Sequence, residues 1–489
     1  MNALPLVLSI SIEVSALIAA FLFILGLKRM SSPVTAPRGI ALAGIGMLLA
    51  VVASFGYLAA LPDAVRPHRL VNLSLALVAL AIGIGWAWRS GRKVAVTAMP
   101  QMVALYNGMG GGAAAAVAAV ALIGDGQPQT SMELAVTVAG ALIGAISLSG
   151  SIIAWAKLDG RIDKPWRWKG QSAFNALVFV VTAALGTYLV VGTASYASLA
   201  LVALFFGGAL AFGILMTMPI GGADMPVVIS LYNAFTGLAV GLEGYALQNP
   251  ALMIAGMVVG SAGTLLTLLM AKAMNRSLTN VLFSNFGDGA ATAQQAIEGQ
   301  LKPVDAGDAG ITMRYASSVI IVPGYGLAVA QAQSKLADLV KLLQAADVDV
   351  KFAMHPVAGR MPGHMNVLLA EAGIAYDLIY DMADINDAFA MTDVALVIGA
   401  NDVVNPAART DKTSPIYGMP ILNVDHAHQV YVIKRGQGKG YAGVENLLFY
   451  GENCNMVYGD AQAVLGRMVQ AIKDLGSDAT ASAPAAQAA

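Results

Sequence analysis

SSVIIVPGYGLAV, residues 317–329, is the stretch that decides the fold of the C-terminal part of this 489-residue chain. It begins with a short apolar run typical of a strand, and a helical pattern continues from Leu327 to Ala346. Between them, GYGLAV has the form Gly-x-Gly-x-x-small. Such a turn places a helix N-terminus against a pyrophosphate, because backbone N–H groups and the helix dipole both favour the anion. A tight turn without a ligand is the alternative interpretation.

Downstream of this turn, short apolar runs alternate with helical patterns, which is typical of a parallel sheet covered by helices on both faces. The predicted strands span residues 317–323, 348–353, 376–380, 394–398, 420–424 and 430–434, and the predicted helices span 327–346, 364–372 and 461–475. We therefore expect an α/β Rossmann-like, doubly wound parallel-sheet domain over residues 311–475, followed by a disordered tail over 476–489.

The sequence before this domain is mostly apolar. The whole chain is 57% hydrophobic and only 12% charged, whereas a soluble domain carries about 25% charged residues. We predict a multi-helix α membrane bundle of about nine transmembrane helices over residues 1–275, since each needs about 20 mostly apolar residues, and a linker over 276–310. The nine apolar blocks are 3–27, 39–61, 70–88, 99–123, 132–156, 173–191, 199–218, 226–247 and 251–271.

Lysine and arginine are distributed unequally between the connections of this bundle, and their excess marks the cytoplasmic side. The even-numbered connections carry only Arg66 and Arg69. The N-terminus is therefore expected outside, and nine crossings deliver the α/β domain to the cytoplasm. The odd-numbered connections carry Lys28, Arg29, Arg38, Arg89, Arg92, Lys93, Lys157, Arg161, Lys164, Arg167, Lys169, Lys272 and Arg276.

Charge, cysteine and histidine content argue against nucleic-acid binding, an internal disulfide and a metal site. A net charge of −1 provides no basic excess for nucleic acid, and Cys454, the single cysteine, cannot form an internal disulfide. His355 and His364 have no cysteine or third histidine nearby, so we expect no metal site. Small residues let membrane helices pack closely, and four Gly-x-x-x-Gly motifs predict such packing, at residues 108–112, 140–144, 237–241 and 256–260.

Two features favour NADP over NAD as the dinucleotide. NAD-binding folds usually place an acidic residue at the tip of the second strand for the ribose 2′-OH, whereas the tip here, residues 352–355, contains none. KRGQGKG, residues 434–440, puts three cations among three glycines after a strand, which suits a 2′-phosphate. A solvated basic loop is the alternative interpretation of this segment.

Six stretches together resemble the beta subunit of proton-translocating NAD(P) transhydrogenase, and the similarity spans nearly the whole chain. They are residues 222–237, 273–277, 323–333, 355–372, 397–408 and 433–449. The resemblance implies an oxidoreductase of the bacterial inner membrane that couples hydride transfer between NAD(H) and NADP(H) to proton translocation. It implies NADP(H) on this chain, NAD(H) on an alpha subunit that adds further membrane helices, and a dimer of the complex.

The resemblance also assigns roles in the α/β domain. Asp402 is expected near the nicotinamide, as the catalytic residue. Lys434 and Arg435 are expected to hold the 2′-phosphate, although the serine that commonly follows this pair is Gly436 here. Tyr441 belongs to a loop expected to close over the nucleotide. The predicted cofactor-binding residues are Gly324, Tyr325, Gly326, Val329, His355, Val357, Ala358, Gly359, Arg360, Gly399, Ala400, Asn401, Asp402, Lys434, Arg435 and Tyr441.

In the membrane bundle the chain has Asn107 where many members of this family carry a histidine, and none of its predicted helices contains a histidine. An asparagine cannot bind and release a proton at ordinary pH. The titrating group of a proton pump is therefore expected elsewhere, on the partner's membrane helices. Glu243 lies near the outer end of its helix, and we expect its carboxyl to reach out to water.

Polar residues within the bundle are candidates for a proton route, because they are costly there and often functional. For Asn107 and Asn233 the alternative is an interhelical hydrogen bond that only packs the bundle. Asp224 and Arg276 flank the last two helices on the cytoplasmic side, and an ion pair between them is a candidate for coupling the membrane part to the NADP domain. The predicted proton pathway comprises Asn107, Asn233, Asp224, Ser261 and Glu13.

Two rival functions are weighed against this interpretation. A channel or transporter whose Rossmann domain only senses nucleotide predicts a filter loop or broken helices at the middle of the membrane, and the sequence shows neither clearly. A single-subunit reductase with haem between helices predicts paired histidines on membrane helices, and the sequence has none there. Only one dinucleotide site is visible, so NAD(H) is expected on a second subunit.

Overall fold

The computed structural model describes residues 3–32, 34–60, 68–123, 130–162, 164–192, 198–221, 224–275, 277–283, 299–359, 363–412, 414, 416–436, 438, 440 and 442–481. The chain divides into two compact units, Met1–Leu268 and Leu269–Ala489. The expected division at residue 275 lies close to this boundary.

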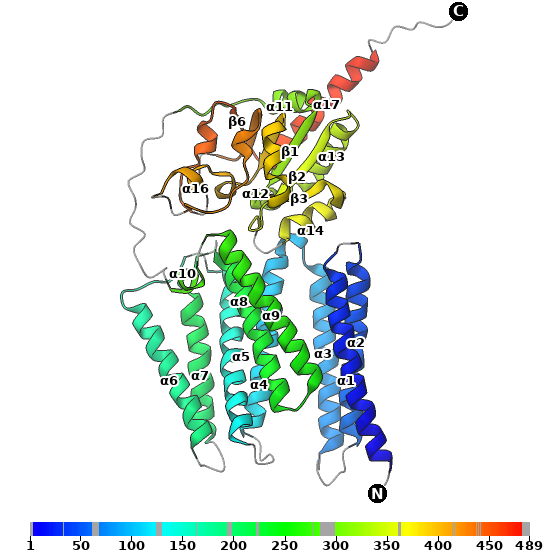
Figure 1. Ribbon diagram of the computed structural model, residues 1–489, viewed down its shortest axis with the longest axis vertical. Helices are drawn as coiled ribbons and strands as arrows, with labels where there is room; N and C mark the ends of the chain where they lie inside the picture. Colours follow the sequence, from blue (N-terminus) through cyan, green and yellow to red (C-terminus); the bar gives the residue numbers. More distant parts are fainter. Residues whose placement is uncertain are drawn as a thin grey trace, which may run out of the picture. The chain divides into compact units, whose positions relative to one another are not determined.

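Nine helices among the described residues are long and apolar enough to cross a membrane, which confirms the predicted multi-helix bundle. Each lies within a few residues of its predicted block (Figure 1). They are α1 Ala3–Met30, α2 Ala36–Ala60, α3 Arg69–Lys93, α4 Met99–Ile123, α5 Ser131–Leu158, α6 Gln171–Val191, α7 Leu199–Thr217, α8 Met225–Ala246 and α9 Pro250–Ala273.

The core of the first unit lies around α5, which contacts α4, α7 and α8. Glycines allow this packing. At the α8–α9 contact, a methyl group on Gly237 would meet the Gly260 backbone, with Cα at only 2.7 Å. A methyl group on Gly256 would meet the Cα of Gly241 at 2.5 Å. The predicted packing role of these two glycine motifs is thus confirmed, because each fits against the other.

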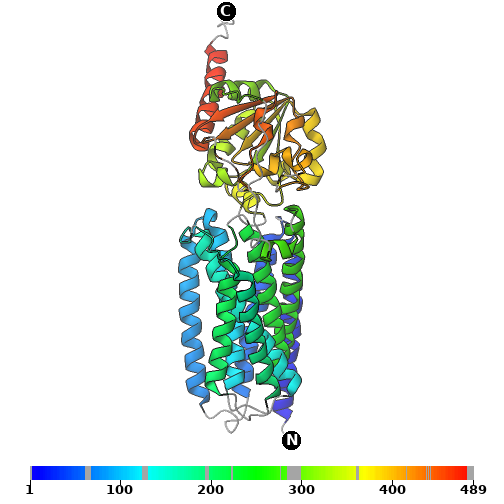
Figure 2. The same cartoon turned by 90° about the vertical axis from the view of Figure 1, so that its left-hand side faces the viewer.

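The second unit contains a parallel sheet of six strands in the order β3-β2-β1-β4-β5-β6, which confirms the doubly wound α/β fold. Figure 2 shows this sheet between helices and irregular segments. On one face, α11 (Ala306–Tyr315) and α13 (Gln333–Gln344) both pack against α17 (Ala461–Ala481). The strands are β1 Ser318–Pro323, β2 Asp349–Met354, β3 Ile379–Asp381, β4 Val394–Ile398, β5 Gln429–Lys434 and β6 Cys454–Tyr458.

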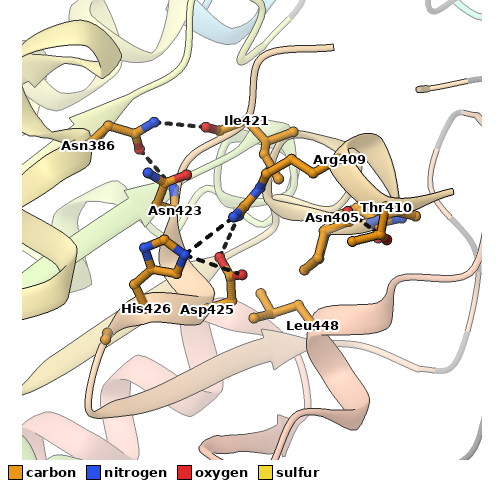
Figure 3. A network of polar contacts seen from close by, with 12 residues as sticks. Asn386, Asn405, Arg409, Thr410, Ile421, Asn423, Asp425, His426 and Leu448 are labelled. Atoms are coloured by element: carbon orange, nitrogen blue, oxygen red, sulfur yellow. Dashed lines mark hydrogen bonds and ion pairs between the residues drawn. The ribbon is translucent and has the colours of Figure 1, made fainter. Parts of the chain in front are cut away.

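One predicted strand, residues 420–424, is wrong. This segment is irregular and leads into a 3-10 turn, Val424–His426. Both edges of β4 are already taken by β1 and β5. Side chains instead hold the segment's backbone: Asn386 Nδ2 donates to the Ile421 carbonyl at 3.0 Å, and Asn386 Oδ1 accepts from the Asn423 N–H at 2.8 Å (Figure 3). The sixth strand, β6, was not predicted.

Helix boundaries in this unit also differ from the prediction. The helix expected over 327–346 is two helices, α12 Tyr325–Val329 and α13 Gln333–Gln344, because Gln331 adopts a left-handed φ of 51° that no helix continues through. The expected linker contains α11 Ala306–Tyr315, begun by Asp305, whose side chain accepts from the Gly307 N–H. The remaining helices are α14 His364–Glu371 and α17 Ala461–Ala481, and α17 extends into the tail expected to be disordered.

Candidate functional site

The carboxyl ends of the strands gather the predicted cofactor residues at one edge of the sheet. Parallel pairing places Pro323 beside Ile398, and Lys434 beside Tyr458, in register. The order of the sheet reverses between β1 and β4, and in doubly wound folds ligands bind outside the carboxyl ends of the strands at such a point. The residues that follow β1, β2, β4 and β5 therefore share the edge where a dinucleotide is expected.

Three glycines interlock at this reversal. The Gly326 N–H donates to the Gly399 carbonyl at 3.0 Å, which ties the turn after β1 to the turn after β4. A methyl group on Gly324 would stand 2.5 Å from the Ala400 nitrogen, and one on Gly326 would stand 2.6 Å from the Gly399 Cα. Gly399 itself has a φ of +67°. The glycine-rich turn is therefore required first by backbone contact between two loops.

Asp402 organises the loop after β5. Its Oδ2 accepts a hydrogen bond from the Ala442 N–H at 3.0 Å, and a side chain on Gly440 would collide with its carboxylate. The preceding residue, Asn401, accepts from the buried Asn446 side chain at 2.9 Å through its carbonyl. Together these contacts hold residues 440 and 442–446 against the end of β4, so Asp402 lies in a fixed position at the carboxyl edge.

Lys434, at the end of β5, borders a hollow at the same edge. Its ammonium lies 4.5 Å from the centre of the Phe449 ring, a cation–π contact. Burial lowers the pKa of Lys434, while the carboxylates of Asp402 and Glu445 act in the opposite direction. An amine with reduced access to water beside two acids can form a strong hydrogen bond to an anion. The hollow is lined by Leu301, Asn401, Lys434, Gly436, Gly438, Glu445, Asn446, Phe449, Tyr450, Met456 and Tyr458.

His355 follows β2 and is buried, with both ring nitrogens engaged. Nδ1 accepts from the Val357 N–H at 3.2 Å, so Nε2 carries the proton and donates to the Pro420 carbonyl at 2.8 Å. Burial lowers the pKa of His355 to about 4, and the Pro420 carbonyl only partly opposes this effect. The imidazole is therefore neutral, and it joins the loop after β2 to the segment mispredicted as a strand.

In the membrane unit, Asn107 belongs to a buried row of polar groups shared by α4, α5 and α8. Its Nδ2 donates to Ser151 Oγ at 3.0 Å, and its carbonyl accepts from Thr236 Oγ1 at 3.3 Å. Thr236 Oγ1 lies 2.6 Å from Ser147 Oγ, which also donates to the Tyr232 carbonyl at 3.0 Å. We call Asn107, Ser147, Ser151 and Thr236 the hydroxyl row.

The row is prolonged toward the end of α5 at which Lys157 lies. The Tyr232 hydroxyl lies 2.6 Å from Thr217 Oγ1, and Lys157 Nζ donates to the Thr217 carbonyl at 2.9 Å. Gly150 makes room for the Tyr232 ring. Ser147, Ser151 and Thr236 were missed from the sequence; the four-residue spacing of the two serines on α5 is the signal that could have indicated a polar face.

The sequence profile of the NAD(P) transhydrogenase beta subunit family matches residues 12–471. Two curated relatives from Rhodospirillum rubrum, one of them from strain ATCC 11170, are both named NAD(P) transhydrogenase subunit beta. Each is 44% identical over 467 residues, which cover 93% of this chain and 98% of the relative. The chain belongs to the NAD(P) transhydrogenase beta subunit family. This result supports the predicted transhydrogenase function and not the nucleotide-sensing channel.

The structure places the other predicted residues of this transhydrogenase subunit in different surroundings. Glu13 and Ser261 are exposed on α1 and α9, outside the hydroxyl row, and Ser261 Oγ donates to its own helix at the Met257 carbonyl. Asn233 is half-buried on α8, and Asp224 is buried at the N-cap of that helix. Arg276, Arg360 and Tyr441 lie outside the described residues.

The remaining predicted cofactor residues lie near the carboxyl edge. The Tyr325 ring lies 6.2 Å from the His364 ring. Gly359 has a φ of +101° and packs against His364, a conformation that favours glycine. Arg435 and Val329 are exposed, while the other members are buried or half-buried. These others are Val357, Ala358 and Ala400.

The expectation that Glu243 reaches out to water is wrong. Its side chain is buried in the transhydrogenase membrane unit, and the residue is only 3% exposed. It points into the space left by Gly140 on α5, where its Cδ would lie 3.2 Å from an added methyl group. The position of Glu243 near the end of α8 did not reveal this burial. Helix α5 extends beyond the end of α8 here and covers the carboxyl.

We expect the α/β domain to lose stability as the pH falls from 7 to 5. The pKa of His355 is lower in the folded state than its ordinary value of 6.5, so the unfolded chain takes up the proton first. The loss is about 2 kcal/mol by pH 5, and it is complete near pH 4. The buried Cys454 reports opening of the domain. Its labelling rate, divided by that of the denatured chain at each pH, should rise less in His355→Asn than in the wild type; equal slopes would contradict this account.

Proposed function

We propose that this chain binds NADP(H) at the carboxyl edge of its sheet and exchanges hydride with NAD(H) held by an alpha subunit. The observation that carries the proposal is the meeting of the interlocked glycines, Asp402 and Lys434 at the reversal point of the sheet, in a chain of the transhydrogenase family. The described residues contain one sheet of this kind. Hydride exchange between two nicotinamides therefore calls for a second subunit.

The residues at the edge suit the chemistry of a phosphorylated dinucleotide. Lys434, half-buried beside the hollow, would pair with the 2′-phosphate, and exposed Arg435 adds a second cation. The close packing that Gly324 and Gly326 allow keeps the turn after β1 at the edge of the sheet where a pyrophosphate is expected. Asp402, fixed by the Ala442 N–H, would position the nicotinamide end.

When bound, the nicotinamide supplies the hydride chemistry, which needs no acid, base or metal. The protein's part is to bring two rings within reach and to exclude water. Asp402, Asn401 and Asn446 keep residues 442–446 in place, and we infer that this loop covers the cofactor. We infer that Tyr441 belongs to that cover.

We further propose that the membrane unit translocates protons and that proton occupancy alters NADP(H) affinity, a linkage that must be reciprocal. The hydroxyl row supports this proposal, because hydrogen-bonded hydroxyls are groups through which a proton can be passed on. Asn107 belongs to the row, and Asn233, Ser261 and Glu13 remain candidates. Asp224 and Arg276 are proposed to couple the units. The Lys and Arg distribution favours an N-terminus outside. From the family we further propose that the chain lies in the bacterial inner membrane and that the complex is a dimer.

Proteoliposomes holding this chain and its alpha subunit test the proposal. A pH gradient is imposed that is acidic on the face corresponding to the outside of the cell. We expect the rate of NADP reduction by NADH to rise under this gradient. A rate indifferent to the gradient would refute proton coupling. Failure of NADPH to bind the purified chain would refute the cofactor assignment independently.

Asp402→Asn tests the role of the carboxylate, because the amide can keep the contact to the Ala442 N–H and loses the charge. We expect hydride transfer to fall about tenfold, the equivalent of about 1.4 kcal/mol in the transition state, with proton coupling reduced in parallel. Asp411→Asn, at another position outside the loop, serves as the control. Normal pumping by Asp402→Asn would remove Asp402 from the mechanism.

A further inference from the structure

Glu243 is a buried carboxyl group for which the packing of the membrane unit alone gives no reason. It is 3% exposed on α8, and neither of its oxygens has a hydrogen-bond partner among the described residues. A carboxylate buried without partners is strongly disfavoured, so the group is held protonated or meets water there. Apolar residues would fill this space at lower cost. An acid kept in such a place is a candidate for a functional proton site.

Gly140 provides the space for this carboxyl. A methyl group at position 140 would collide with Oε1 of Glu243. The other glycine of the same motif, Gly144, does what the motif predicts: a methyl group there would stand 3.1 Å from the Ala115 nitrogen of α4. One glycine of the pair therefore packs two helices together, and the other accommodates an ionisable side chain.

The charged and titratable groups on the helices around Glu243 lie elsewhere. On α5, Glu133 forms the capping box with Thr130, about 10 Å along the helix from Gly140. Lys157 lies near the other end of α5, bonded to carbonyl groups. The other such groups on α4, α8 and α9 are Tyr106, which bonds Ser90, Tyr232, which bonds Thr217, the exposed Tyr245, and Lys272 in the last turn of α9.

Glu243 lies in line with the hydroxyl row. Thr236 precedes it by seven residues on α8, and Ser147 follows Gly140 by seven residues on α5, so both pairs are two turns apart on one face of their helices. The step from the carboxyl to the Thr236–Ser147 pair is about 10 Å. A chain of about three waters would span it, with polar groups at both ends.

We propose that Glu243 is a proton-binding residue of this chain, which takes up a proton from the outer side and releases it toward the hydroxyl row. This inference rests on the proposed proton translocation. In uptake, the carboxylate accepts a proton from hydronium and leaves water; in release, the carboxylic acid passes it to bridging water. Asn107 lacks a titratable group, so it accepts and donates hydrogen bonds in this route while Glu243 changes its charge.

The test uses the whole complex in proteoliposomes and three variants. Glu243→Gln keeps the shape and removes the titration, Gly140→Ala fills the space, and Glu133→Gln is the matched control at a half-buried acid of the same helix pair. We expect Glu243→Gln to lower gradient-driven NADP reduction at least tenfold and to remove one step from its pH profile. Gly140→Ala should displace the carboxyl and weaken coupling, and Glu133→Gln should behave like the wild type.

A second measurement does not depend on a variant that assembles. Dicyclohexylcarbodiimide reacts with protonated carboxyls in apolar surroundings, and mass spectrometry identifies the modified residue. We expect labelling of Glu243 in the wild type that decreases as the pH rises and changes when NADPH is added. Labelling absent throughout pH 5 to 9 would overturn the proposal.

The outcomes separate the two levels of inference. If the wild type is gradient-driven and Glu243→Gln is too, with an unchanged pH profile, Glu243 is not a proton site and the proposed function stands. If the wild type ignores the gradient, the proposed translocation fails and the role of Glu243 fails with it. Loss of coupling in Glu243→Gln and retention in Glu133→Gln would establish the site.

Discussion

Lys434→Met is expected to weaken NADPH binding about a hundredfold, because a charge-assisted hydrogen bond to the 2′-phosphate is worth about 1.5 to 3 kcal/mol and each 1.4 kcal/mol is tenfold. The substitution keeps the aliphatic stem over the Phe449 ring and removes the ammonium. It also leaves Asp402 and Glu445 without their neighbouring cation, which repels the phosphate further. Titration calorimetry of the purified chain, without its alpha subunit, measures the dissociation constants of NADPH and NADH.

The selectivity between the two nucleotides provides the sharper result. NADH lacks the 2′-phosphate, so its weak binding to this domain should hardly change, and the preference for NADPH should nearly vanish. Lys473→Met, at an exposed lysine on α17, is the matched control. If Lys434→Met lowered both affinities equally, Lys434 would support the fold of the pocket and would not recognise the phosphate.

Gly399→Ala is expected to destabilise the α/β domain by about 4 kcal/mol. Its φ of +67° costs an alanine about 1 to 2 kcal/mol, and the collision of the new methyl group with the Gly326 backbone adds about 1 to 3 kcal/mol. Neither loop can move away easily, since Gly326 N–H is bonded to the Gly399 carbonyl. We expect the two turns at the reversal of the sheet to separate, and NADPH affinity to fall with them.

Cys454 makes this loss measurable in the intact chain. It is the single cysteine, it is buried in the core of the domain, and burial raises its thiol pKa to about 12, so it reacts only when the domain opens. Labelling should accelerate several hundredfold in Gly399→Ala. Gly373→Ala is the matched control, because Gly373 has a φ of +82° and open space around it. Equal acceleration in both variants would mean that the collision contributes nothing.

Much of the fold follows from the sequence because its signals are local. Each membrane helix is a continuous apolar block bounded by polar residues, and the structure reproduces all nine blocks among its described residues. Strands β1, β2, β4 and β5 are short apolar runs of the kind that a parallel sheet buries on both faces. The wrong prediction of a strand over residues 420–424 has the same origin. An apolar run indicates burial, and this segment is buried without hydrogen-bonded pairing to another strand.

The candidate site was predictable only in part. Lys434, Asp402 and the glycines follow strands, and parallel strands bring their carboxyl ends together whatever the details of packing. The hydroxyl row was not predictable beyond Asn107, because serine and threonine are common in membrane helices, where they bond to their own backbone. Whether these serine and threonine hydroxyls bond between helices depends on which face of α5 packs against α4 and α8.

The sequence alone determined the bundle, the doubly wound domain and the family of this chain, since apolar length, strand alternation and long motifs are properties of contiguous residues. Only the tertiary structure decided that Gly399 locks two loops, that His355 is neutral and fully bonded, and that Glu243 turns inward to the space at Gly140. Each of these depends on two segments distant in sequence that meet in space. Whether a polar group is buried depends on the residues of the other segment that pack against it. The local sequence around the group does not specify those residues.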